Sequence, residues 1–119
     1  MKLAEIAFFT DQVALMTDFY RQLLGAEPIA RSETMAIFFV NGTKIFIHHN
    51  YTPVNGELLP ENHYAFMVED VDQVCGQLLK QGLMPEVPPQ DFYWGRSAYL
   101  RDPDGHQIEI MQMEKYHAG

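Results

Sequence analysis

The chain has 119 residues, which is enough for one compact domain with its own hydrophobic core. Sixteen acidic residues against eight basic ones give a formal net charge of −8, and this excess argues against a nucleic-acid partner. No apolar run is long enough to span a bilayer and no signal-peptide pattern opens the sequence. The single cysteine cannot form an internal disulfide, so we expect a cytoplasmic protein.

The first half of the chain, about residues 1–50, reads as one structural module. Residues 5–11 predict a strand of alternating side chains, with Ile6 and Phe8 on one side. Apolar residues at helical spacing follow from Val13 to Leu24, and Gly25 is typical of a residue that ends a helix. Extended pieces around 29–31, 35–40 and 43–47 complete the half. The predicted order is therefore β-α-β-β-β.

The second half, about residues 62–113, repeats this pattern after a linker of residues 51–61 that is rich in Pro, Gly and Asn. Residues 63–69 resemble residues 5–11, and residues 104–110 align with residues 41–47. A second helical pattern begins after Asp70, and Asp70 with Gln73 three residues later predicts a capping box. Because one half cannot bury both faces of its sheet, the sequence predicts one α+β domain built from two paired βαβββ modules.

The repeat also places the candidate chemistry. It aligns Glu5 with His63, and Phe46 with Glu109. By strand alternation, all four side chains lie opposite to the apolar residues that face the helices, and so does His48. Glu5, His63 and Glu109 would thus share the inner face of the sheet. A divalent cation accepts such a set of nitrogen and oxygen ligands.

Each of these residues also has a structural alternative. His63 could be a hydrogen-bonded histidine with no ligand role. Glu5 could form an ion pair with Arg96 or Arg101 instead of binding a metal. Both alternatives stay open on the sequence alone.

Residues 88–95 place three aromatic side chains in a predicted loop before the strand that begins near Arg96. The loop could form a lid that stacks on a flat ligand, or it could pack on the second helix or in a dimer interface. The residues predicted to contact a substrate are Phe46, His48, Met67, Phe92, Trp94 and Arg96.

Four segments together, residues 5–9, 18–25, 63–72 and 101–110, resemble the vicinal oxygen chelate superfamily. This superfamily contains glyoxalase I, bleomycin-resistance proteins, fosfomycin-resistance proteins and extradiol dioxygenases. The resemblance implies paired βαβββ modules, commonly as a homodimer, with a metal or a ligand in the cupped sheet. His63 and Glu109 match metal-binding residues of the superfamily, and Glu5 stands where His or Gln is usual. Phe46 stands where glyoxalase I has a second Glu, for which His48 could substitute.

We therefore expect a glyoxalase-like enzyme, a lyase, an isomerase or a related enzyme, that acts on a small molecule. A divalent metal held by Glu5, His63 and Glu109 would chelate neighbouring substrate oxygens, and Glu5 and Glu109 would be the catalytic residues. The alternative is a metal-free protein that binds a drug or another small molecule, as the bleomycin-resistance proteins do. In either case the partner is a small molecule, not a nucleic acid or a membrane.

Overall fold

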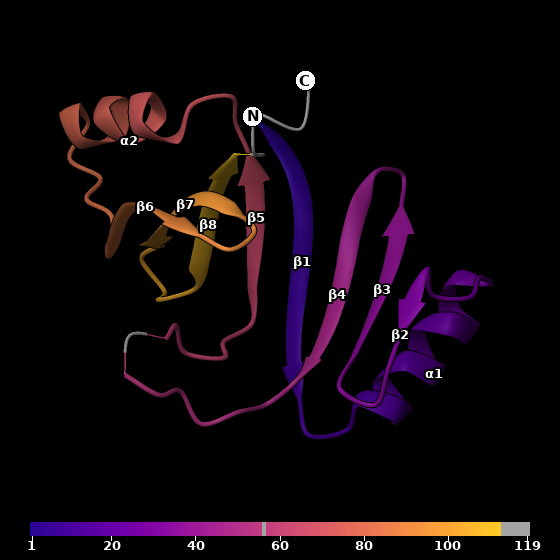
Figure 1. The fold of residues 1–119 in the computed structure, drawn as a ribbon. Helices are drawn as coiled ribbons and strands as arrows, with labels where there is room; N and C mark the ends of the chain where they lie inside the picture. Colours follow the sequence, from indigo (N-terminus) through magenta and orange to yellow (C-terminus); the bar gives the residue numbers. More distant parts are fainter. Residues whose placement is uncertain (56, 113–119) are drawn as a thin grey trace. The chain divides into compact units, whose positions relative to one another are not determined.

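The computed structural model describes residues 1–55 and 57–112, with eight strands and two helices in this part of the chain. The chain divides into two compact units (Figure 1). We call residues 5–62 the N-terminal unit, and residues 1–4 together with the chain from His63 onward the C-terminal unit. The predicted α+β class is confirmed. Gly56 of the predicted linker and Met113, the predicted end of the second module, lie outside the described residues.

The N-terminal unit has the predicted βαβββ order. Its elements are β1 (Lys2–Thr10, of which residues 5–10 belong to this unit), α1 (Val13–Leu24), β2 (Ala30–Arg31), β3 (Met35–Val40) and β4 (Thr43–His49). The strands lie in the order β2-β3-β4-β1. β1 is parallel to β4, and the other pairs are antiparallel. The parallel pair follows from the helical crossover between β1 and the rest of the unit.

Helix α1 covers one face of this sheet (Figure 1). Its apolar stripe packs on alternate residues of β3 and β4, which gives a core of Val13, Ala36, Phe38 and Ile47. The helix ends at Gly25, whose φ of 65° is the left-handed conformation that glycine adopts without a steric penalty. The predicted start and end of this helix are confirmed.

The C-terminal unit repeats the order. It contains β5 (His63–Met67), α2 (Val71–Lys80), β6 (Val87–Phe92), β7 (Gly95–Arg101) and β8 (Gln107–Gln112). The strands lie in the order β5-β8-β7-β6, with β5 parallel to β8 and the other pairs antiparallel. The Asp70 side chain accepts a hydrogen bond from the backbone N–H of Gln73, which confirms the N-cap half of the predicted capping box. A buried cluster of Val71, Cys75, Ala98 and Ile110 joins α2 to one face of the sheet.

The predicted loop at residues 88–95 is wrong for most of its length, because Pro88 to Phe92 belong to β6. Two consecutive prolines argued against a strand, since neither can donate a ladder hydrogen bond. β6, however, is the last strand in the order, pairs only with β7 in this unit, and its register shifts between Val87 and Gln90. An outer strand with such an irregularity tolerates prolines. Only Tyr93 and Trp94 remain in the turn.

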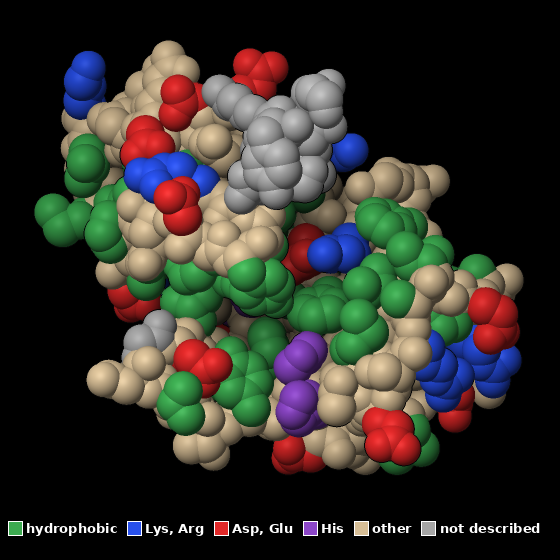
Figure 2. All heavy atoms as spheres, viewed as in Figure 1, with side chains coloured by type: hydrophobic (Ala, Val, Ile, Leu, Met, Phe, Trp, Pro, Cys, Tyr) green, Lys and Arg blue, Asp and Glu red, His purple; other side chains and the backbone are tan. Residues whose placement is uncertain are grey.

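Charged side chains of both signs lie beside one another on the face drawn in Figure 2. Among the described residues, neither helix has the length and apolar character needed to cross a membrane.

Candidate functional site

Glu109 lies near the middle of β8, between Tyr99 on β7 and Ala65 on β5 in the register of the sheet. Its neighbours Ile108 and Ile110 pack in the cluster under α2, so strand alternation turns Glu109 to the opposite face. Only 3% of Glu109 is exposed. A carboxylate this deeply buried needs hydrogen-bond partners, because losing water without compensation costs several kcal/mol.

Two neutral groups bind one oxygen of this carboxylate. The Ser97 hydroxyl donates to Glu109 Oε2 at 2.7 Å. The indole Nε1–H of Trp94 lies 3.2 Å from the same oxygen and 3.1 Å from the Ser97 hydroxyl oxygen. Ser97 is fully buried, so no solvent competes for its hydroxyl.

The other oxygen of the carboxylate faces His63. The distance from His63 Nε2 to Glu109 Oε1 is 3.2 Å, and the two side chains are 11% and 4% exposed. The His63 ring also meets the ring of Tyr99 edge to face, with centroids 6.1 Å apart. His63 and Glu109 therefore come together from β5 and β8.

The aromatic residues before β7 form a packed group beside this pair. The rings of Phe92 and Trp94 are stacked with centroids 4.6 Å apart, and Tyr99 meets Phe92 edge to face at 6.0 Å. Tyr93, in contrast, is 96% exposed. Trp94 thus reaches Glu109 through its N–H, which the sequence analysis did not anticipate.

Three other predicted site residues belong to the N-terminal unit: Glu5, Phe46 and His48. Glu5 Oε1 lies 3.0 Å from Lys44 Nζ, which in turn lies 5.5 Å from the centre of the Phe46 ring. Lys44 is therefore the cation beside Glu5, a partner that the sequence analysis had not considered.

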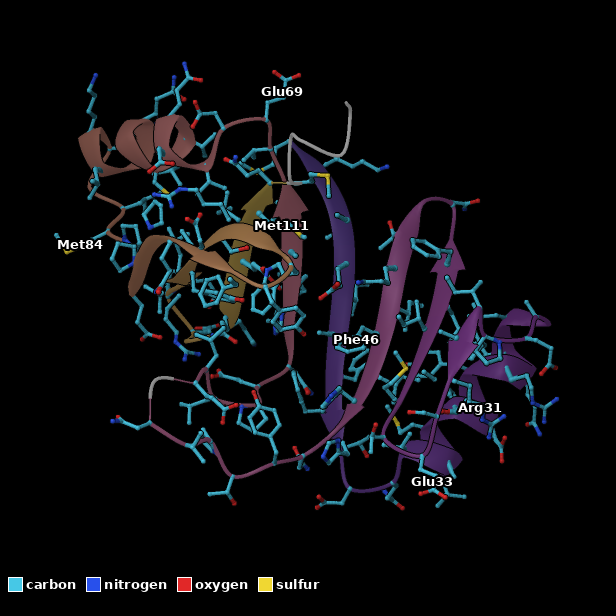
Figure 3. All side chains as sticks on the ribbon, viewed as in Figure 1. Arg31, Glu33, Phe46, Glu69, Met84 and Met111 are labelled. Carbon is cyan, nitrogen blue, oxygen red and sulfur yellow. The ribbon has the colours of Figure 1, made fainter. Side chains whose placement is uncertain are left out.

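Phe46 extends from β4 on the side of β1 (Figure 3). The ring of His48 lies near the rings of Phe46 and Phe9, with centroids 5.4 and 5.6 Å apart. His48 Nδ1 lies 2.8 Å from the carbonyl oxygen of His49 and donates to it. This bond leaves His48 Nε2 as the nitrogen that could serve as a ligand. The convergence of Glu5 with His63 and Glu109 stays a prediction.

Arg96 lies on the other face of the C-terminal sheet. Its guanidinium binds the carboxylate of Asp72 through Nε and Nη2, at 2.7 and 3.0 Å, and Nη1 binds Asp91 at 3.0 Å. The hydrogen bonds from Arg96 hold the pKa of the Asp72 carboxyl below its ordinary value. These bonds link α2 to the β6–β7 hairpin and use the guanidinium that we had assigned to substrate. Arg101 binds Glu86.

Met67 follows His63 and Ala65 on the same face of β5, next to Met111 in the register of β8. Met111 is labelled in Figure 3. The position of Met67 agrees with a face shared with Glu109, by strand alternation.

Ser97 and Tyr99 were not among the residues predicted for the site. A signal for both was present, because the tight turn at residues 102–106 sets the register of β7 against β8. Arg101 pairs with Gln107, and two residues further from the turn on each strand Tyr99 pairs with Glu109. Ser97 lies two residues further and faces the same side.

The donor atoms of the His63–Glu109 pair fit a divalent metal. Imidazole nitrogen and carboxylate oxygen are ligands that such ions accept, typically about 2.0–2.2 Å from the ion. Two donors 3.2 Å apart can both reach one ion at that range. The burial of Glu109 also favours an ion, because a nearby positive charge compensates a desolvated carboxylate.

Comparisons with known proteins agree with this fold. The uncharacterized protein YraH of Bacillus subtilis (strain 168) is 32% identical over 128 residues, which cover 95% of this chain and 99% of that protein. Metallothiol transferase FosB of Staphylococcus haemolyticus is 28% identical over 109 residues, 88% of this chain and 78% of FosB. The structure of hypothetical protein BH1468 from Bacillus halodurans C-125 has a TM-score of 0.73 at 16% identity, over 96% of this chain and 95% of that chain, and so shows a shared fold.

A family model covers almost the whole described chain. The model of the Glyoxalase/Bleomycin resistance protein/Dioxygenase superfamily matches residues 2–110, from the first strand to the strand that carries Glu109. Both βαβββ units therefore lie within the match. This chain belongs to the Glyoxalase/Bleomycin resistance protein/Dioxygenase superfamily.

Proposed function

We propose that the protein is a glyoxalase-like enzyme that acts on a small molecule and uses a divalent metal held by His63, Glu109 and Glu5. The observation that carries this proposal is the buried pair of His63 Nε2 and Glu109 Oε1, 3.2 Å apart. The name of the related FosB, a metallothiol transferase, supports a metal-dependent chemistry.

When bound, the metal would polarise neighbouring oxygens of a substrate and stabilise negative charge that develops on them. The protein side chains perform the other tasks. His63 and Glu109 would hold the ion, while the face of the sheet around Met67 and Trp94 would exclude water and contact the substrate. Glu5 is proposed as a third ligand whose carboxylate, once displaced from the ion, could accept a proton from the substrate. Its carboxylate lies beside the Lys44 ammonium, with Oε1 3.0 Å from Nζ.

The decisive experiment is metal analysis of protein purified without chelators. We expect about one divalent ion per chain in the wild type, and a large loss in His63→Ala. Glu109→Gln should also lose metal but keep its fold. The amide oxygen can accept the hydrogen bonds of Ser97 and Trp94, and the amide N–H₂ can face His63.

The matched control is Glu69→Gln, which removes the same charge from an exposed position in the same unit. It should leave the metal content unchanged. Metal-free wild-type protein that also fails to bind added Zn²⁺, Mn²⁺ or Ni²⁺ would refute the proposal.

A second candidate function is metal-free binding of a small molecule. The observation that favours it is the stacked pair of Phe92 and Trp94, because such rings can also stack on a flat ligand. Binding of this kind should quench the fluorescence of Trp94, the single tryptophan, without added metal. It should also survive Glu109→Gln unless the ligand is cationic.

We further propose that the protein is a cytoplasmic homodimer. The proposal rests on the superfamily and on exposed apolar side chains such as Leu15, Phe19 and Leu23 of α1, which a single small chain seldom leaves open. Sedimentation equilibrium at micromolar concentration should give the mass of two chains. A mass of one chain would contradict this proposal and leave the metal site untouched.

A further inference from the structure

We infer that Ser97 and Trp94 are positioning residues that restrict Glu109 to binding a metal through Oε1 alone. This inference rests on the proposed metal site. Toward the metal, both residues act only through Glu109. The two oxygens of this buried carboxylate have different partners.

Oε2 of Glu109 already accepts two hydrogen bonds. The Ser97 hydroxyl lies 2.7 Å away, which is the length of a strong bond to a charged acceptor, and the Trp94 Nε1–H lies 3.2 Å away. Oε1 faces His63 Nε2 instead. A carboxylate that bound an ion through both oxygens would have to turn Oε2 toward the ion and stretch both hydrogen bonds. The two donors therefore favour one-oxygen binding.

Both donors are neutral, and this decides what they can do. A lysine or arginine at the same place would cancel the charge of Glu109 and compete with a metal ion. Ser97 and Trp94 orient the carboxylate without cancelling its charge. The neighbouring guanidinium of Arg96 is turned to the other face, where it binds Asp72 and Asp91. The negative charge of Glu109 thus stays available for a cation.

The donors are themselves held in place. Trp94 stacks on Phe92 at 4.6 Å with an angle of 3° between the rings, and its N–H also reaches the Ser97 hydroxyl oxygen. Phe92 pairs with Gly95 across a two-residue turn that contains Trp94. Hydrogen-bonded partners of this kind fix the orientation of a ligand and typically change metal affinity 10–100-fold when removed.

The test measures metal binding and binding mode, without enzyme activity. Binding of Zn²⁺ alone and of Mn²⁺ alone is measured by titration calorimetry for the wild type, Ser97→Ala and Trp94→Phe. Trp94→Phe removes the N–H but keeps a ring that can stack on Phe92. Tyr93→Phe, in the same turn but 96% exposed, is the matched control. We expect affinity to fall about tenfold or more in the first two variants and to stay unchanged in the control.

Infrared difference spectra with and without metal report the binding mode. The two stretching bands of a carboxylate lie far apart when one oxygen binds an ion and closer together when both bind. The bands of Glu109 are those that vanish in Glu109→Gln. We expect widely separated bands in the wild type, and a smaller separation in the double variant Ser97→Ala/Trp94→Phe, whose carboxylate is free to turn.

The outcomes separate this inference from the proposed function. Metal binding by the wild type with unchanged affinity and unchanged bands in all variants would overturn the inference and leave the metal site standing. Weaker binding together with a smaller band separation supports it. A wild type that binds neither ion overturns the proposed function and this inference together.

Discussion

Replacing Ser97 by alanine should destabilise the metal-free protein by about 2 kcal/mol. The hydroxyl is fully buried and donates to a carboxylate oxygen at 2.7 Å. A hydrogen bond to a charged group contributes about 1.5–3 kcal/mol, and its loss leaves Oε2 with the longer bond from Trp94 alone. Because Ser97 is fully buried, we expect no solvent to replace the bond.

Thermal unfolding followed by circular dichroism, with chelator present, measures this loss. For a chain of 119 residues, about 2 kcal/mol corresponds to a fall in Tm of about 8 °C. Urea unfolding at 25 °C should give the same free-energy difference with an unchanged slope. Ser32→Ala is the control, because Ser32 is exposed and its hydroxyl contacts only its own loop. It should change the stability by less than about 0.5 kcal/mol.

Equal and small effects of Ser97→Ala and Ser32→Ala would refute the reasoning. They would mean that the carboxylate of Glu109 gains nothing from the buried hydroxyl, and its restraint by Ser97 would then have no energetic basis. A loss well above 3 kcal/mol would point to a disturbed core around Ala98 instead.

Three further outcomes follow from the structure. Asp72→Asn should cost less than about 1 kcal/mol at pH 7, because its pair with Arg96 is largely exposed. Arg96 lowers the pKa of Asp72 below 3.8. The pair therefore stabilises the fold above pH 3.8, and this stabilisation is lost as the pH falls through the folded-state pKa of Asp72. The urea unfolding midpoints of the wild type and the variant should converge in strong acid. Cys75 is buried, and burial raises the pKa of its thiol. A thiol reagent at pH 8 should therefore label Cys75 slowly until urea unfolds the protein. Rapid labelling of the native protein would contradict the place of Cys75 in the core. Gly25→Ala should lower the free energy of unfolding by about 1 kcal/mol, because φ is 65° at this position. Gly76→Ala inside α2 has room for a methyl group and should raise the free energy of unfolding. Unfolding curves that rank the two variants the other way would argue against Gly25 as the C-cap of α1.

Strand and helix order was readable from the sequence because local signals agreed with one another. Helix α1 is specified by the apolar spacing of residues 13–24 and by Gly25 at its end, and the start of α2 is specified by Asp70. None of these signals depends on contacts that are distant in the sequence. The repeat then placed His63 and Glu109 on the same face. Strand alternation is a local property, so the sequence alone placed both side chains on one face. The parallel pairing of β5 with β8 then brings His63 Nε2 to 3.2 Å from Glu109 Oε1.

Three features were decided by tertiary structure alone. The pairing of β6 with β7 converted Pro88–Phe92 from a predicted loop into an outer strand, because only pairing partners determine whether a proline costs a hydrogen bond. The choice of partner for each charge depended on which face of a strand it occupied, so Lys44 lies beside Glu5 and Asp72 beside Arg96.

The environment of Glu109 is the third of these features. The sequence identified the carboxylate, but the hydroxyl of Ser97 and the indole of Trp94 reach it from a neighbouring strand and its turn, 12 and 15 residues away along the chain. The tight turn at residues 102–106 indicates the register of β7 against β8 and hence the strand position of Ser97. The fold of the turn before β7, which brings in the indole of Trp94, is not specified by side-chain spacing. The sequence therefore determined that His63 and Glu109 lie on the same face of the sheet. The packed structure determined that Oε2 of Glu109 accepts two hydrogen bonds while Oε1 faces His63.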